Sequence, residues 1–199
     1  MTERNPSSPR YDAITIGASA GGIEALSELL PRLPADLRAS VVVVLHLRRE
    51  RPSLLAEVFA PRCALPVREV HDKDELRPGT IYFAPPDYHV LFDRGPQLAL
   101  STEGLVQYSR PSIDVTFESA AQLLRERLLA IVLTGANEDG AQGLRAVHEC
   151  GGTTIVQSPE TARSSLMPTS ALKSSPVDFV LPLEAIGALL LSFHREERL

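Results

Sequence analysis

Few cysteines, no basic excess and no long apolar run restrict what this 199-residue chain can be. Its two cysteines, Cys63 and Cys150, lack metal-binding or redox spacing, so both are expected to be reduced thiols without a functional role. The formal net charge of −5 leaves no basic footprint for nucleic acid. No apolar run approaches the roughly 20 residues that span a bilayer, and the N-terminus has no apolar signal-peptide core. No His/Cys/carboxylate cluster has zinc spacing. We therefore expect a cytoplasmic protein with no metal or cofactor, no nucleic-acid partner and no membrane insertion.

The order of apolar runs predicts a doubly wound α/β fold with a mostly parallel sheet and helices on both faces. Continuous apolar strands are expected at 11–16, 41–47 and 128–133, with shorter strands at 153–157 and 177–181. Helices are expected at 21–32, 53–60, 112–127, 139–150, 168–174 and 183–195. Four short segments separated by Gly and Pro, 66–70, 80–84, 89–93 and 97–101, are expected to form β-hairpins that extend one edge of the sheet. The length suits a single domain over residues 11–195, after a disordered tail at 1–10.

A glycine-rich turn, Gly17-Ala18-Ser19-Ala20-Gly21-Gly22, follows the first predicted strand. The glycines permit a tight strand-to-helix turn that exposes the Ser19 hydroxyl, where N–H groups at the start of a helix can stabilise an oxyanion. The same turn could instead hold a phosphate, and Ser19 could be a helix N-cap. The turn alone does not separate these interpretations.

Two further polar residues follow predicted strands. His46 ends the strand at 41–47, and Asp139 follows the strand at 128–133. Ligand sites of parallel α/β sheets lie outside the carboxyl ends of the strands, so Ser19, His46 and Asp139 can converge there as a hydrolytic triad. His46 could instead be a core histidine, and Asp139 could cap the helix that it precedes.

At this point five separated blocks of the chain carry a family resemblance. Together they resemble the catalytic domain of chemotaxis protein-glutamate methylesterase, the CheB family, over roughly residues 11 to 192. The resemblance implies Ser19 as nucleophile, His46 as general base and Asp139 as the acid that orients His46. It also implies hydrolysis of methyl-esterified glutamates, and often deamidation of glutamines, on chemoreceptors. The blocks are Gly17–Gly22 with His46, Ala84–His89, Arg110–Phe117, Thr134–Ala141 and Met167-Pro168.

The chain departs from the usual family pattern near the expected oxyanion hole. Ala20 stands where the family usually has Thr, and Ala136-Asn137 stands where it usually has Met-Gly. Backbone N–H donors survive such side-chain changes, so Ala20 and Ala136 remain candidates for oxyanion or substrate binding.

Three more residues are candidates for substrate binding. Arg110 could bind a substrate carboxylate through two parallel hydrogen bonds. His89 could line the substrate cleft or belong to a structural turn. Met167 is expected to form a wall of the cleft.

The family typically carries an N-terminal receiver domain, whereas only residues 1–10 precede the first predicted strand here. We therefore expect no control by phosphorylation in cis, so that any regulatory protein would be a separate one. Arg48, Arg49 and Arg51 could meet acidic receptor helices or be a solvated run. The alternatives to an esterase are a nucleotide-binding module that uses the Gly17–Gly22 turn and an inactive partner-binding domain. The turn does not have the G-x-G-x-x-G spacing of dinucleotide-binding proteins, and His46 stands where such proteins have an acidic residue at the end of the second strand.

Overall fold

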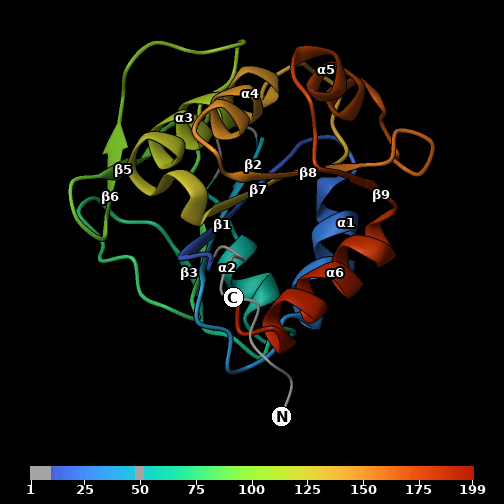
Figure 1. Cartoon of the computed structure of the whole chain (residues 1–199). Helices are drawn as coiled ribbons and strands as arrows, with labels where there is room; N and C mark the ends of the chain where they lie inside the picture. Colours follow the sequence, from blue (N-terminus) through green and yellow to red (C-terminus); the bar gives the residue numbers. More distant parts are fainter. Residues whose placement is uncertain (1–9, 48–51) are drawn as a thin grey trace.

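The computed structural model describes residues 10–47 and 52–199, and Arg48, Arg49 and Arg51 lie outside the described residues. Parallel strands form one sheet in the order β3-β4-β2-β1-β7-β8-β9, with helices on both faces (Figure 1). Its strands are β1 (Ala13–Ala18), β2 (Ser40–Leu45), β3 (Val67–Glu69), β4 (Ile81–Phe83), β7 (Leu128–Val132), β8 (Thr153–Gln157) and β9 (Phe179–Leu181). The predicted doubly wound α/β class is confirmed.

The helices lie in two layers, as Figure 1 shows. One buried cluster joins α1, α2 and α6 to the sheet, and a second joins α3, α4 and α5 to its other face. Successive residues of a strand point to opposite faces, so Val41 and Val43 belong to the first cluster and Val42 and Val44 to the second. The helices are α1 (Gly22–Leu29), α2 (Leu55–Phe59), α3 (Ile113–Leu124), α4 (Ala141–Glu149), α5 (Leu166–Ser174) and α6 (Leu183–Arg195), with 3₁₀ turns η1 (Leu30–Arg32) and η2 (Arg125–Arg127).

The predicted series of edge hairpins is wrong for two of its four strands. Strands β3 and β4 pair in parallel and extend the main sheet beyond β2. Only β5 (His89–Asp93) and β6 (Gln97–Ser101) form an antiparallel hairpin, which is a separate two-stranded sheet. The three residues of β4 are all buried, which is the signature of a parallel strand, but a run of three is too short to reveal this in the sequence.

Strand order places a switch point at β1. From β1 the chain passes to β2, then to the edge strand β3 and back to β4 between them, and it then crosses to β7, β8 and β9 on the other side of β1. A crevice at the carboxyl end of the strands at such a point is where doubly wound sheets bind their ligands. Within residues 10–47 and 52–199, every helix is too short or too polar to cross a membrane.

Candidate active site

The ends of β1 and β2 set Ser19 and His46 side by side. The two strands are in parallel register, with Ala18 opposite Leu45, and each proposed site residue comes directly after its strand. The His46 backbone N–H donates to the Ala18 carbonyl at 3.1 Å, and the Ser19 N–H donates to the Thr134 carbonyl beyond β7 at 3.0 Å. Backbone bonds therefore fix both residues at the switch point.

The turn after β1 needs glycine for two separate reasons. Gly21 has a φ of 82°, a left-handed conformation that side chains disfavour, and it leads into α1. Gly17 lies under the start of α3, and a Cβ there would be 2.4 Å from Cγ2 of Ile113. The absence of that carbon lets α3 begin directly above the end of β1.

Ser19 and His46 both line a cleft of about 350 Å³. Ser19 is half-buried, and its hydroxyl makes no hydrogen bond with any residue that the structure describes. Arg163 and Glu24 form an ion pair whose residues also line this cleft. Ser19 thus exposes a free hydroxyl to a cleft, as a nucleophile requires. The full lining is Ser19, Ala20, Gly21, Gly22, Ile23, Glu24, Leu45, His46, Leu47 and Arg163.

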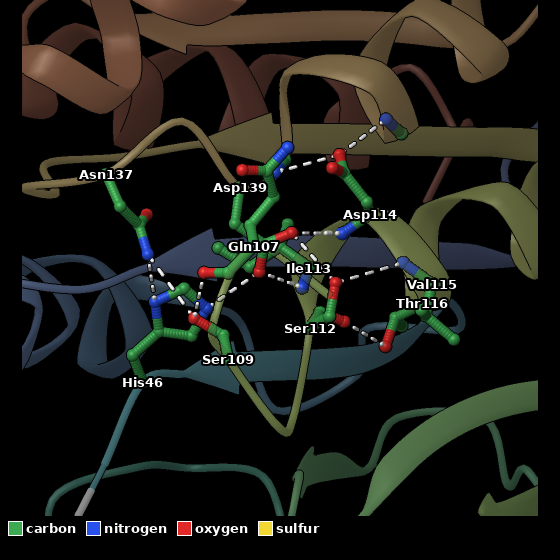
Figure 2. Close-up of polar contacts among 12 residues, drawn as sticks. His46, Gln107, Ser109, Ser112, Ile113, Asp114, Val115, Thr116, Asn137 and Asp139 are labelled. Carbon is green, nitrogen blue, oxygen red and sulfur yellow. Dashed lines mark hydrogen bonds and ion pairs between the residues drawn. The ribbon is translucent and has the colours of Figure 1, made fainter. Parts of the chain in front are cut away.

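His46 and Asp139 are in direct contact, as Figure 2 shows. His46 Nε2 lies 2.8 Å from Oδ2 of Asp139, and the His46 side chain is 12% exposed while that of Asp139 is 0% exposed. The structure therefore brings the predicted base and acid together, although they are separated by 93 residues.

Asp139 is a carboxylate enclosed by donors. Its Oδ1 accepts the Ser112 hydroxyl at 2.8 Å and the Asp114 N–H at 3.0 Å, while its Oδ2 accepts the Ile113 N–H at 2.7 Å as well as His46. Burial raises the pKa of Asp139, but the hydrogen bonds from His46, Asp114 and Ile113 outweigh burial and hold that pKa below its usual value. Asp139 is therefore ionised and can only accept hydrogen bonds.

Asp139 also binds the start of a helix, but not of the helix that follows it, which was the alternative left open for this residue. Helix α4, which follows Asp139, has Gly140 at its N-cap and no side-chain cap. Asp139 instead binds the first two N–H groups of α3, those of Ile113 and Asp114. The N-terminus of a helix favours negative charge, which adds to the stabilisation of the buried carboxylate. Ser112 is the N-cap of α3, and its hydroxyl accepts the Val115 N–H at 3.4 Å.

Asp114, in α3, binds the start of α4 in the same way that Asp139 binds the start of α3. Sequence reasoning missed it as a residue of the site. Its Oδ1 accepts the N–H groups of Gly140 and Gly143 at 2.9 and 2.7 Å, at the start of α4. Burial and then the charge of Asp139 raise the pKa of Asp114 to about 7. Asp114 was visible in the sequence only as an acid in the first turn of a helix, because its partners lie 26 and 29 residues away.

The predicted oxyanion donors are available. Ala20 and Ala136 are exposed, and neither backbone N–H has an acceptor among the residues described. An oxyanion hole needs such unoccupied N–H groups, so both assignments stay predictions with suitable donors in place.

Arg110 and His89 are committed to structural contacts instead of the cleft. The Arg110 guanidinium donates to Oδ1 of Asp87 through Nε and Nη2 at 3.1 and 2.7 Å, and its Nη1 donates to the carbonyls of Thr102 and Glu103 at 2.7 and 2.9 Å. His89 is 2% exposed, and Gly104 O and Ser112 N contact its two ring nitrogens at 3.0 and 3.1 Å. Of the two readings of His89, the structural turn fits this burial.

Met167 packs against the loop after β7. It does not line the cleft at Ser19, where it was expected to form a wall. It is 1% exposed, and its N–H donates to the Gly135 carbonyl at 2.9 Å. A Cβ at Gly135 would lie 2.5 Å from the Met167 Cε. This packing fixes the path of the loop that carries Ala136, Asn137 and Asp139.

A parallel α/β fold with a serine, a histidine and a buried aspartate at one edge of its sheet is typical of serine hydrolases. The family model described as CheB methylesterase matches residues 14–190. The chain belongs to the CheB methylesterase family, and the resemblance carried by the Ser19, His46 and Asp139 blocks is confirmed.

Individual relatives agree with this assignment. A protein of Leptospira interrogans, provisionally named protein-glutamate methylesterase/protein-glutamine glutaminase, is 41% identical over 181 residues, which cover 91% of this chain and 94% of the relative. A relative from Symbiobacterium thermophilum with the same two activities in its name is 38% identical, and the match covers 87% of this chain and 48% of the relative. The chain thus spans about half of that longer relative. The crystal structure of the Thermotoga maritima CheB methylesterase catalytic domain has a TM-score of 0.87 at 32% identity, over 92% of this chain and 98% of that one.

Proposed function

We propose that this chain is a serine hydrolase that removes methyl esters from glutamate side chains of a chemoreceptor-like signalling protein, with glutamine deamidation as a second reaction of the same site. Family membership supports the esterase over the nucleotide-binding alternative. The observation that carries the proposal is the 2.8 Å contact between His46 and the buried Asp139 at the sheet edge where Ser19 faces the cleft.

The contact with Asp139 assigns the ring nitrogens of His46. Because the Asp139 carboxylate only accepts hydrogen bonds, Nε2 of His46 carries the proton and Nδ1 carries the lone pair. Nδ1 is therefore the atom that takes the Ser19 proton, and Asp139 stabilises the imidazolium that results.

The reaction then follows in two halves. Ser19 Oγ attacks the ester carbonyl carbon as its proton passes to His46, and the N–H groups of Ala20 and Ala136 are the donors for the oxyanion. The intermediate collapses, methoxide takes the proton from His46, and methanol leaves an acyl-serine. Water attacks this acyl group, His46 takes and returns its proton, and glutamate is released. With a glutamine side chain the first leaving group is ammonia.

Labelling of Ser19 by a fluorophosphonate tests the nucleophile without knowledge of the receptor. We expect the folded protein to be labelled at Ser19 and to release methanol from a methyl-esterified receptor fragment. Ser19→Ala is expected to lose both properties, with turnover lower by several orders of magnitude. Ser27→Ala, which removes a half-buried hydroxyl on α1, is the matched control and should change neither.

The same experiment identifies an inactive domain. A folded Ser19→Ala variant that keeps more than about a tenth of the turnover would exclude Ser19 as the nucleophile. A folded wild-type protein that is neither labelled nor active would support a partner-binding domain instead. The cytoplasmic location and a separate regulatory protein remain predictions.

A further inference from the structure

Asn137 contacts the ring nitrogen of the proposed general base that Asp139 does not bind (Figure 2). Its Nδ2 is 3.2 Å from Nδ1 of His46 and 3.4 Å from the Ser109 hydroxyl oxygen. Its Oδ1 is buried and has no hydrogen-bond partner among the residues that the structure describes. Within that part of the chain, the polar contacts of this side chain are made by its amide nitrogen, and the shorter of the two is to the base.

The His46 Nδ1 has a single lone pair and two donors that need it. Asp139 fixes the proton of neutral His46 on Nε2, so Nδ1 accepts the Asn137 amide N–H. The Ser19 hydroxyl must donate to the same lone pair before its proton can be transferred, and in this structure it makes no hydrogen bond to any described residue. Asn137 and Ser19 therefore compete for the atom that acts as the base.

We propose that Asn137 is a positioning residue that occupies the lone pair of His46 in the resting enzyme and must release it before Ser19 is deprotonated. This inference rests on the proposed function, because it assumes His46 as base. The Ser109 hydroxyl is already within reach of Nδ2 and is the acceptor that remains after release. Ser109 belongs to a tight turn in which Val106 and Ser109 are paired through their backbones. The position of this turn therefore affects how readily Asn137 leaves the lone pair of His46.

Removal of the Asn137 amide is expected to release the base. Turnover of Asn137→Ala and of Asn137→Leu, which has the same branching at Cγ and no donor, should rise about 2- to 10-fold at the pH plateau, the range of one neutral hydrogen bond. The acid limb of kcat/KM against pH should move to higher pH by up to about one unit, because the lost bond stabilised the neutral ring. The ionisable groups around this ring in the described structure are Asp139 at Nε2, Asp114 behind it, and Arg163 and Glu24 in the shared cleft, and the substitution leaves all four in place.

A spectroscopic measurement separates this proposal from the proposed function. In ¹⁵N NMR spectra of the neutral ring, the Nδ1 resonance of His46 should move downfield in both Asn137 variants, because an acceptor nitrogen loses its donor. Gln142→Ala removes an exposed amide on α4 that contacts Ser174 and should leave the resonance and the turnover unchanged. An unmoved Nδ1 resonance in both variants, or a fall in turnover, would overturn the proposal. Retained turnover in Ser19→Ala would instead overturn the proposed function, whatever the NMR result.

Discussion

Replacement of Asp139 by Asn is the most demanding test of how the acid is held. Each carboxylate oxygen accepts two hydrogen bonds: Oδ1 from Ser112 and Asp114, and Oδ2 from Ile113 and His46. Asn has only one oxygen, so whichever way its amide is turned, its NH₂ group faces two donors. On either side one of the two groups, the Ser112 hydroxyl or Nε2 of His46, can reverse its role and accept, but the backbone N–H of Asp114 or of Ile113 loses its acceptor.

The size of the effect follows from these bonds. A hydrogen bond to a charged group contributes about 1.5–3 kcal/mol and one between neutral groups about 0.5–1.5 kcal/mol, so one bond is lost and the others weaken, while relief of the repulsion from Asp114 offsets part of this loss. We therefore expect Asp139→Asn to lower the free energy of unfolding by about 3 kcal/mol, which is roughly 6–12 °C in melting temperature for a chain of this size. An N-cap of α4 would have tolerated this change, because Asn and Asp cap equally well.

Turnover should fall as well, because Asn can neither stabilise the imidazolium nor select the correct tautomer of His46. The equivalent change in a serine protease costs about 10⁴-fold. We expect roughly 10²- to 10³-fold here, because a methyl ester has a better leaving group than an amide and depends less on acid catalysis.

Asp114→Asn is the matched control in the same buried environment. Both of its backbone bonds are to Oδ1, so the Asn oxygen can keep them. Thermal unfolding and initial rates of ester hydrolysis should show a large loss for Asp139→Asn and a small one for Asp114→Asn. Equal melting temperatures for the wild type and Asp139→Asn would refute the assignment of four donors to this carboxylate, and full activity would place the acid of the triad elsewhere.

Two further predictions concern the supports of the site. The pKa of Asp114 is about 7 in the folded state, above its usual value of 3.8, so the folded state binds this proton more tightly than the unfolded state does. The contribution of Asp114 to stability therefore falls as pH rises from about 4 to 7, by about 1.4 kcal/mol for each unit of pKa difference. Denaturant unfolding at several pH values should show this slope in the wild type and a shallower one in Asp114→Asn; parallel curves would contradict it. Gly135→Ala should cost about 1–3 kcal/mol, because its Cβ would lie 2.9 Å from Cβ of Met167, an atom that no change of rotamer moves away, as well as 2.5 Å from its Cε. Gly104→Ala, with nothing within 4 Å of the added carbon, should stay within about 0.5 kcal/mol, and equal unfolding midpoints for the two variants would rule out the clash.

The sequence was sufficient to place Ser19, His46 and Asp139 at one edge because each follows a strand whose continuous apolar character marks it as parallel. The fold class followed from the same runs. The parallel pairing of β3 and β4 was beyond reach, since segments of three residues separated by Gly and Pro look the same whether they pair with each other as hairpins or join a sheet.

The sequence also did not reveal which side chains bind partners that are distant along the chain. The alternative left open for Asp139 was a cap on the helix that follows it, yet it binds the start of a helix 26 residues earlier. Arg110 was a candidate substrate ligand, yet it binds the Asp87 carboxylate and the backbone carbonyls of Thr102 and Glu103, and carbonyls leave no trace in a sequence pattern. Asn137 was noted as a departure from the family pattern, but its contact with His46 depends on the path of the loop after β7.

Two carboxylates connect the beginnings of α3 and α4, and each of them binds N–H groups at the start of the other helix. Asp139, just before α4, holds the start of α3, and Asp114, in the first turn of α3, holds the start of α4. Neither helix can fray at its beginning without removing an acceptor from the other, so the two ends open and close as one cooperative unit. Because His46 is bound to the same carboxylate, the orientation of the base is acquired only when that unit closes. A state in which this unit is open would therefore lack an oriented base even with the parallel sheet in place, so hydrolysis depends on the closure of both helix ends.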